Sequence, residues 1–534
     1  MNNLLNFNKR FGDHSISGVV GQSFERSKES ATTLTGTNFM DDRVLSILSA
    51  SNRSVINAIT QEWTLASFLG RIDYGYKDKY LVGITNRIDG SSRFSENNRF
   101  VSFPSVSAGW VLSKEKFLKN ASWINELKLR GSWGLTGTDG GAGYYGSLGQ
   151  YAYTSTGTTY ASTTIISATR PANSDLKWQK TTNIDFGLDA GFLQNRIRVT
   201  AEYYKRTTEN LLVNGGLPGF VGFSTQQQNL GELVNRGFEL TLSTRNIDKK
   251  DFSWTSTFNI ARNENIITKL NFANKLDASL TAERSGGRFW VEGGSATAFN
   301  LMYWGGVDAA TGNPRWIGAN DTVSLVPFEI LYVGTSRDFN RERRNMGDAL
   351  PSFFGGFDNR IRYKNLEFSF FFTFAAGNKV FNGAKASMYA YSSVDAPNLS
   401  NDILNYWKRP GDVTEIPALI NRSNTAFTPG GSTSQFTDYT LGRNSSRFLE
   451  DGSFVRLKNL TLSYNFGDAL LKKSGIIGSS IRVFAEANNV FLLTKYTGID
   501  PEVSAYGSSV LQAGYDEVSL PNPRTFRIGF KIGL

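Results

Sequence analysis

The sequence predicts an all-β fold, a large antiparallel transmembrane β-barrel. Apolar residues alternate with polar or small ones along many segments, as in TFRIGFKIGL at 525–534, and this period of two is typical of strands. Glycine is abundant at 53 residues and aromatic residues make up 13%, whereas proline numbers only 13, which favours long strands joined by flexible loops. The strands run to about 10 to 15 residues, against an average of about 5 to 6 in soluble proteins.

The expected strands follow the chain in order and number fifteen. They are residues 2–11, 15–27, 62–76, 79–92, 101–113, 125–135, 178–193, 196–209, 232–246, 251–265, 353–363, 366–378, 453–466, 480–493 and 523–534. A strand of about 12 residues, tilted by about 45°, rises roughly 28 Å, close to the hydrocarbon thickness of a bilayer. We therefore expect the apolar face of each strand to contact lipid rather than a second sheet.

Short turns join several of these strands into hairpins, at GDH (12–14), KDK (77–79), DKK (248–250) and two further sites. A two-residue turn at Gln194-Asn195 pairs Phe192 with Ile197, Ala190 with Val199, Leu188 with Ala201 and Phe186 with Tyr203. A turn at Lys364-Asn365 pairs Ile361 with Phe368, Phe357 with Phe372 and Arg362 with Glu367. In both hairpins the apolar faces of the two strands coincide.

Long connections alternate with the short turns, and residues 1–534 are expected to form one barrel portion. Outer-membrane barrels have short periplasmic turns and long external loops, so we assign the long connections to the outside. These loops are 28–61, 136–177, 210–231, 266–352, 379–452 and 494–522. Aromatic residues beside the short turns are expected to form an interfacial girdle: Phe11, Tyr76, Tyr80, Phe192, Phe252, Tyr363 and Phe466.

Composition excludes several other classes of protein. No window approaches 18 consecutive apolar residues, so a helical membrane protein is excluded. Cysteine is absent and His14 is the single histidine, a satisfied turn residue in this interpretation, so neither a multi-histidine metal site nor a Ser-His-Asp triad is expected. The formal charge of +10 is scattered over strands and turns, which argues against a nucleic-acid partner. The amino-terminal segment MNNLLNFNKRFGDH lacks the features of a signal peptide.

The orientation of the strands carries a further expectation. If the short turns are periplasmic, the first strand runs inward from outside and the last ends in the periplasm. Closed bacterial barrels have an even number of strands and both termini in the periplasm. We therefore expect an odd number of strands to precede Met1, and the sequence to be the carboxy-terminal part of a larger barrel.

Several stretches resemble the SusC/RagA group of TonB-dependent outer-membrane transporters, in the order of that family. They are LKLRGSWGLTGT (127–138), NSDLKWQKTTNIDFGLDAGFLQNRIRVTAEYYKRTTENLL (173–212), NLGELVNRGFELTL (229–242), GVDAATGNPRW (306–316), DGSFVRLKNLTLSYNF (451–466) and NNVFLLTKYTGIDPEV (488–503). The resemblance implies a 22-stranded barrel that is preceded by a plug, a TonB box and an accessory domain. None of these three amino-terminal parts is recognisable here. One departure is the last residue, Leu534, where such barrels often end in an aromatic residue.

The resemblance also implies a function and partners. Such transporters lie in the outer membrane of Gram-negative bacteria and import oligosaccharides or peptides, with energy that TonB, ExbB and ExbD deliver. A SusD-like surface lipoprotein covers the external loops and captures substrate. By this resemblance the chain is not an enzyme, and neither a catalytic residue, a cofactor nor a metal is expected.

Two groups of residues are candidates for contact with substrate, lid or lumen. In the loop 136–177 five tyrosines interleave with Gly, Ser and Thr: Tyr144, Tyr145, Tyr151, Tyr153 and Tyr160. Their rings are candidates for stacking on sugars or for contact with the lid, and packing within the loop is the alternative. Eight charged residues on the polar strand faces are candidates for lining a hydrated lumen: Asp185, Asp189, Arg198, Glu202, Arg362, Glu367, Arg482 and Glu486. Pairing with one another, or contact with the plug, is the alternative.

Two local motifs have ordinary interpretations. GAGYYG (141–146) matches G-x-G-x-x-G, but no helical pattern follows, so we expect a flexible loop rather than a dinucleotide site. LSNDILNYWKRPGD (399–412) predicts a short helix with Ser400 or Asn401 as its cap and Pro410 as its stop.

Two other functions stay open at this point. A soluble or surface-anchored all-β protein that binds or cleaves glycans would place the alternating apolar residues in a core rather than on an outward belt. A passive porin would share the barrel, but porins do not share the quoted motifs.

Overall fold

The computed structural model describes residues 1–534 except 42, 45, 154–158, 161–162, 165, 224, 271–289, 319–320, 322, 325–342, 390–397, 420–444, 467–479, 508–511 and 534. Its contacts divide into two compact units. Unit 1 comprises Met1–Glu115, Lys128–Phe186 and Arg206–Leu233, and unit 2 comprises Lys116–Leu127, Gly187–Lys205 and Val234–Leu534.

A 15-stranded sheet is the main element of the described residues. Its strands follow in hydrogen-bonded order as β1 (Asn2–Phe11), β2 (His14–Phe39), β3 (Ala50–Tyr76), β4 (Tyr80–Ser91), β5 (Phe100–Val111), β6 (Ile124–Thr138), β11 (Gln179–Phe192), β12 (Ile197–Glu209), β15 (Glu232–Asp248), β16 (Phe252–Lys269), β22 (Phe353–Tyr363), β23 (Leu366–Ala376), β26 (Phe454–Phe466), β27 (Ser480–Thr494) and β29 (Thr525–Gly533). The all-β prediction and the fifteen strands are confirmed.

The long connections contain small elements of their own. The strands are β7 (Gln150–Tyr153), β8 (Thr159–Tyr160), β9 (Thr163–Thr164), β10 (Ile166–Arg170), β13 (Leu212–Gly216), β14 (Thr225–Asn229), β17 (Ala298–Leu301), β18 (Tyr303–Val307), β19 (Pro314–Ile317), β20 (Val323–Ser324), β21 (Arg344–Asp348), β24 (Lys379–Asn382), β25 (Leu449–Asp451) and β28 (Tyr515–Asp516). The helices are α2 (Gly383–Met388) and the 3-10 turns η1 (Ile47–Ser49), η2 (Glu96–Asn98), η3 (Leu112–Lys114), η4 (Lys116–Leu118), η5 (Gly140–Ala142), η6 (Gly219–Val221), η9 (Asn401–Asn405) and η11 (Ser446–Phe448). No helix in the described ranges has the length and hydropathy that a membrane crossing requires.

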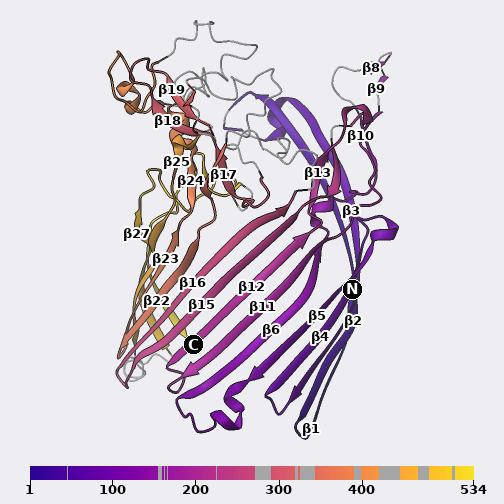
Figure 1. Ribbon diagram of the computed structural model, residues 1–534, viewed down its shortest axis with the longest axis vertical. Helices are drawn as coiled ribbons and strands as arrows, with labels where there is room; N and C mark the ends of the chain where they lie inside the picture. The colour runs from indigo at the N-terminus through magenta and orange to yellow at the C-terminus, as the bar shows by residue number, and fades with distance from the viewer. Residues whose placement is uncertain are drawn as a thin grey trace. The chain divides into compact units, whose positions relative to one another are not determined.

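In unit 1 the strands β1 to β5 pair as consecutive antiparallel neighbours, and β2 and β3 continue beyond them (Figure 1). The β2–β3 ladder runs from His14 opposite Tyr76 to Phe39 opposite Ala50, with one bulge at Thr33 and Leu34. The interpretation of 28–61 as a loop is therefore wrong for most of its length. The polar, Thr-rich segment lacks apolar alternation, yet backbone hydrogen bonds maintain the ladder without it, together with a bond between the Ser30 and Thr60 hydroxyls over 3.1 Å.

In unit 2 the hairpin of β22 and β23 has the predicted register. Ile361 lies opposite Phe368, Phe357 opposite Phe372 and Arg362 opposite Glu367, which confirms the three pairs. The turn between β11 and β12 comprises residues 193–196, of which Leu193, Gln194 and Asn195 adopt positive φ.

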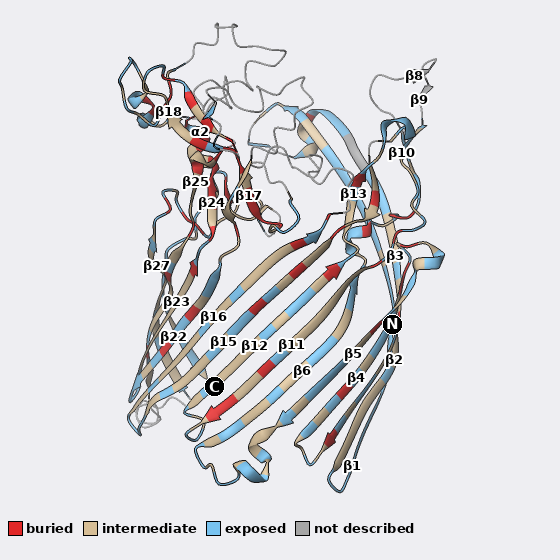
Figure 2. Cartoon of the chain, in the orientation of Figure 1, coloured by how far each residue is buried: buried red, intermediate tan, exposed pale blue. Residues whose placement is uncertain are grey.

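The apolar faces of the strands are exposed. On β29, Phe526, Ile528 and Phe530 are 71%, 87% and 73% exposed. Most residues of the buried clusters lie instead on the short strands and turns of the connections, with Phe103 of β5 as an exception. In Figure 2 β17 and β24 are largely buried, whereas the strands of the large sheet are mostly intermediate or exposed with a few buried patches. Apolar residues that form an outward belt are incompatible with the soluble alternative, in which they would be sealed in a core.

Candidate functional site

A cation–aromatic stack holds the start of the loop 136–177 in unit 1. Arg93 lies in the link between β4 and β5, and its guanidinium carbon stands 4.9 Å from the ring centroid of Trp63 and 5.2 Å from that of Tyr144. Its Nη1 also donates to the carbonyl oxygen of Asp139 over 3.3 Å. A guanidinium between two aromatic faces contributes about 0.5 to 2 kcal/mol per contact, depending on desolvation. The stack therefore fastens the loop to β3.

Hydrogen bonds attach two of the candidate tyrosines to the same strands. The Tyr144 hydroxyl donates to Oε2 of Glu29 over 2.6 Å, and the Tyr145 hydroxyl accepts from the backbone N–H of Glu62 over 3.2 Å. The bond to Glu29 raises the pKa of Tyr144, because ionisation would remove the donated hydrogen and set two negative charges together. Both residues contact their own chain, which is the packing alternative stated for them.

The remaining candidate tyrosines are less engaged. Tyr151 on β7 lies opposite Ala168 of β10, and its side chain is 72% exposed. The side chains of Tyr153 and Tyr160 lie outside the described residues. Among the candidate tyrosines whose side chains the structure describes, Tyr151 is the most exposed.

Replacement of Arg93 by lysine tests the stack. Lysine keeps the charge but loses the planar face, so we expect a loss of about 1 kcal/mol of loop docking, hence roughly fivefold faster hydrogen exchange in 139–147. Exchange mass spectrometry measures this rate, and Arg53→Lys, an exposed arginine on β3, is the matched control. An unchanged rate for Arg93→Lys would show that the stack does not hold the loop.

Below Tyr144 the loop inserts into a small core. Ala142, in the GAGYYG motif, is buried with Phe94, Phe103, Leu176 and Trp178. Strand β7 follows the motif instead of a helix, as expected for a loop rather than for a dinucleotide site. The motif's first residues therefore anchor the connection.

The candidate lumen charges lie on the polar strand faces, and several are paired. In unit 2, Arg482 Nη2 is 3.2 Å from Oε1 of Glu367, and Arg527 Nη2 is 2.7 Å from Oε1 of Glu486. Arg362 lies opposite Glu367 in the ladder.

The other four candidate charges lie on β11 and β12. In unit 1, Asp185 accepts from the Ser132 hydroxyl over 3.4 Å. In unit 2, Asp189 accepts from the Thr200 hydroxyl over 3.3 Å, Arg198 is exposed and Glu202 is half-buried with an interaction of its own. The polar face thus carries charges of both signs, and several of them are paired with one another.

A row of five aromatic rings crosses the turn ends of β1 to β5. Phe11, His14, Tyr76, Tyr80 and Trp110 lie opposite one another in consecutive ladders. Successive ring centroids are 5.3, 5.0, 6.3 and 6.4 Å apart. The predicted girdle residues of this region share one row, as a membrane interface requires. Sequence inspection missed Trp110, because the link 93–100 between the two predicted strands is too long to fix the register that sets Trp110 opposite Tyr80.

His14 is the satisfied turn residue that the sequence predicted. Its Nδ1 lies 2.7 Å from the Tyr74 hydroxyl, and its ring contacts Phe11 and Tyr76. Within the described residues, no group of three or more His, Cys, Asp or Glu side chains could hold a metal ion.

A buried ion pair fixes the connection 494–522 of unit 2 to β26. Arg456 and Asp500 are 3% and 2% exposed, and Arg456 Nη2 lies 2.5 Å from Asp500 Oδ1. Arg456 also pairs with Glu502, and Asp500 Oδ2 accepts from the backbone N–H of Asn522 over 3.0 Å. The two partners come from two of the motifs quoted above, YTGIDPEV and FVRLKN, which meet here.

The connection 379–452 has its own buried layer in unit 2. Burial and the hydrogen bond to Asp402 raise the pKa of Tyr389 to about 12. The predicted helix at 399–412 is a shorter 3-10 turn, Asn401–Asn405, whose cap is Ser400 as expected; its chain leaves the helix at Tyr406, before Pro410. The helix stops early because the backbone of Tyr406 is extended and pairs with Ile416, while Ile403 packs into the buried layer.

The chain resembles known receptors over most of its length. Residues 2–490 match the family described as TonB dependent receptor-like, beta-barrel. "TonB-dependent receptor P3" of Formosa agariphila is 30% identical over 99% of this chain, and "TonB-dependent receptor SusC" of Bacteroides thetaiotaomicron is 33% identical over 88%. The chain spans 52% and 44% of those proteins, so about half their length.

A solved structure shares the fold. "Structure of the RagAB peptide transporter" superposes with a TM-score of 0.81 at 24% identity, covering 100% of this chain and 55% of that one. At this identity the likeness concerns the fold alone.

Proposed function

The chain belongs to the TonB-dependent receptor-like β-barrel family, whose members are outer-membrane receptors and transporters rather than enzymes, and from this premise we propose that it imports large nutrients. The substrates are oligosaccharides or peptides. The supporting observation is the division of strands such as β26, β27 and β29 into an exposed apolar face and a charged polar face, which suits a wall between lipid and a hydrated passage.

The partners in this proposal follow from the relatives. SusC-like and RagA-like chains imply a SusD-like lipoprotein over the external loops and energy from TonB, ExbB and ExbD through a plug domain. We assign substrate or lid contact to the loop 136–177, whose start is held by the Arg93 stack and on which Tyr151 is exposed.

Uptake in whole cells tests the proposal. We expect deletion of the gene to abolish uptake of one labelled oligosaccharide or peptide class and the wild-type gene to restore it. Tyr151→Ala should lower the uptake rate about fivefold, because the loss of a stacking ring costs about 1 kcal/mol. Leu148→Ala, also exposed in this loop at 58%, is the control. Unchanged uptake of all tested oligosaccharides and peptides after deletion would contradict nutrient import.

A further inference from the structure

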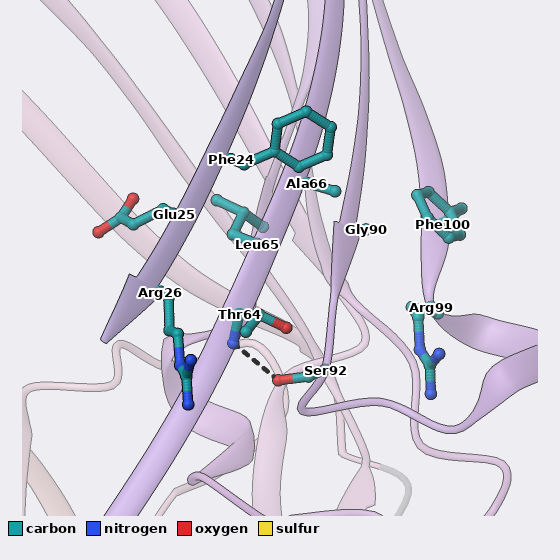
Figure 3. A pocket seen from close by; sticks show the side chains of 10 residues that line it. All are labelled: Phe24, Glu25, Arg26, Thr64, Leu65, Ala66, Gly90, Ser92, Arg99 and Phe100. Atoms are coloured by element: carbon teal, nitrogen blue, oxygen red, sulfur yellow. Dashed lines mark hydrogen bonds between the residues drawn. The ribbon is translucent and has the colours of Figure 1, made fainter. Parts of the chain in front are cut away.

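A groove of about 460 Å³ lies across β2 to β5 in unit 1 (Figure 3). Phe24, Ala66, Gly90 and Phe100 lie opposite one another in successive ladders and so share one face. Phe24 forms one wall, the Phe100 ring lies over Gly90 and forms the other, and the small Ala66 leaves the floor between them low. A Cβ on Gly90 would stand 2.2 Å from the Phe100 ring, so glycine is required for that ring position.

The groove lies on the apolar, outward face of the strands. Ile72, Ile84 and Val106 occupy the same face by alternation and are 56%, 59% and 43% exposed. Ten residues separate Ala66 from Tyr76 in the aromatic row. At about 3.3 Å per residue and a tilt of about 45°, this is roughly 23 Å, close to the height of the apolar band of a membrane barrel. The groove therefore lies at the bilayer boundary farther from the short turns.

Cationic and hydroxyl groups surround this end of the groove. Arg26 and Arg99 line it, together with Thr64 and Ser92. Arg26 binds Glu62 through Nε and Nη2, at 2.6 and 2.9 Å, so Nη1 is left over for a ligand. Figure 3 shows both guanidinium groups directed the same way from their strands, and Glu25 directed away from the Phe24 ring. The Arg99 guanidinium has no partner in the described part of the chain.

We propose that this groove binds one phosphorylated membrane lipid. An acyl chain lies over Ala66, between the Phe24 ring and the Phe100 ring that covers Gly90, and the phosphate bonds Arg99 and the free Nη1 of Arg26. Arginine is the side chain best suited to a phosphate, because its planar donors match the phosphate oxygens. An apolar groove that ends in two arginines at a bilayer boundary fits a phosphorylated lipid better than a neutral one, because a neutral lipid leaves the two cations without an anion. The proposal rests on the outward orientation of this face and is independent of what is transported.

Native mass spectrometry of the protein extracted from outer membranes and exchanged into detergent tests the proposal. The probes are phosphatidic acid and diacylglycerol with the same acyl chains. We expect phosphatidic acid to bind about tenfold more tightly than diacylglycerol, because only it carries the phosphate. Arg99→Gln and Ala66→Phe should each lower phosphatidic acid occupancy about tenfold, the first by loss of the charge and the second by filling the floor.

Matched variants separate the groove from the rest of the surface. Arg53→Gln removes an exposed arginine outside the groove, and Val106→Phe adds a ring to the same face away from it; both should bind like the wild type. Equal binding of the two lipids, full displacement of phosphatidic acid by inorganic phosphate, or unchanged binding in both groove variants would overturn the proposal. Because the readout is lipid occupancy, a failure here leaves nutrient import untouched, and a failed uptake assay leaves the lipid site untouched.

Discussion

Replacement of Arg456 by methionine is expected to destabilise the protein by about 3 to 5 kcal/mol. The side chain is 3% exposed and pairs with the equally buried Asp500. Its removal leaves a carboxylate without a cation in a place that water does not reach, and that penalty exceeds what the lost packing costs. Urea unfolding of the detergent-solubilised protein, followed by its heat-modifiable electrophoretic mobility, measures the loss.

Lys458→Gln is the control for this prediction. Lys458 is 37% exposed and lies 3.7 Å from Glu502, so its loss should cost no more than about 1 kcal/mol. The double variant Arg456→Met with Asp500→Asn should recover part of the stability, because no buried charge then remains at position 500. Equal losses in Arg456→Met and Lys458→Gln would show that the buried pair does not fix the connection 494–522.

The hairpin of β22 and β23 shows what local sequence determines. Alternation places Phe357 and Ile361 on one face, and the turn at Lys364, where φ is 51°, sets the register. Both signals are local and act together, so the predicted pairs hold. The extension of β2 and β3 was not predictable in this way, because its side chains are mostly polar and do not alternate, and its side-chain bonds, between Ser30 and Thr60 and from Tyr144 to Glu29, have no local signal.

The loop stack and the buried pair have no local signal. The stack joins three parts of the chain that are far apart in sequence: Trp63 on β3, Arg93 in the link after β4 and Tyr144 in the loop 136–177. The residues next to each of them in the sequence do not distinguish it from any exposed arginine or aromatic residue. Arg456 and Asp500 both lie in the quoted motifs, yet a motif gives no partner for either. The aromatic ring of Tyr144 therefore made it a candidate for ligand contact in the sequence, whereas in the structure it contacts Arg93 and Glu29 of its own chain.

The second large effect concerns the outward face of the strands. Leu462 on β26 lies between Phe368 and Ala485 and is 47% exposed. It stands four residues from Phe466 at the turn end, roughly 9 Å deep at a tilt of about 45°, within an apolar band about 25 Å tall. Leu462→Arg should therefore cost about 2 to 4 kcal/mol and lower the assembled fraction in outer membranes.

Thr461→Arg adds the same charge one residue away, on the opposite face. Thr461 lies opposite Glu486, whose carboxylate already binds Arg527, so a new cation there meets water and a negative charge. We expect it to cost less than about 1 kcal/mol, because exposed ion pairs contribute little either way. Unfolding in liposomes and the assembled fraction measure both variants. If arginine is tolerated equally at 461 and 462, hydrocarbon does not contact the face that carries Leu462, and the membrane orientation of these strands is wrong.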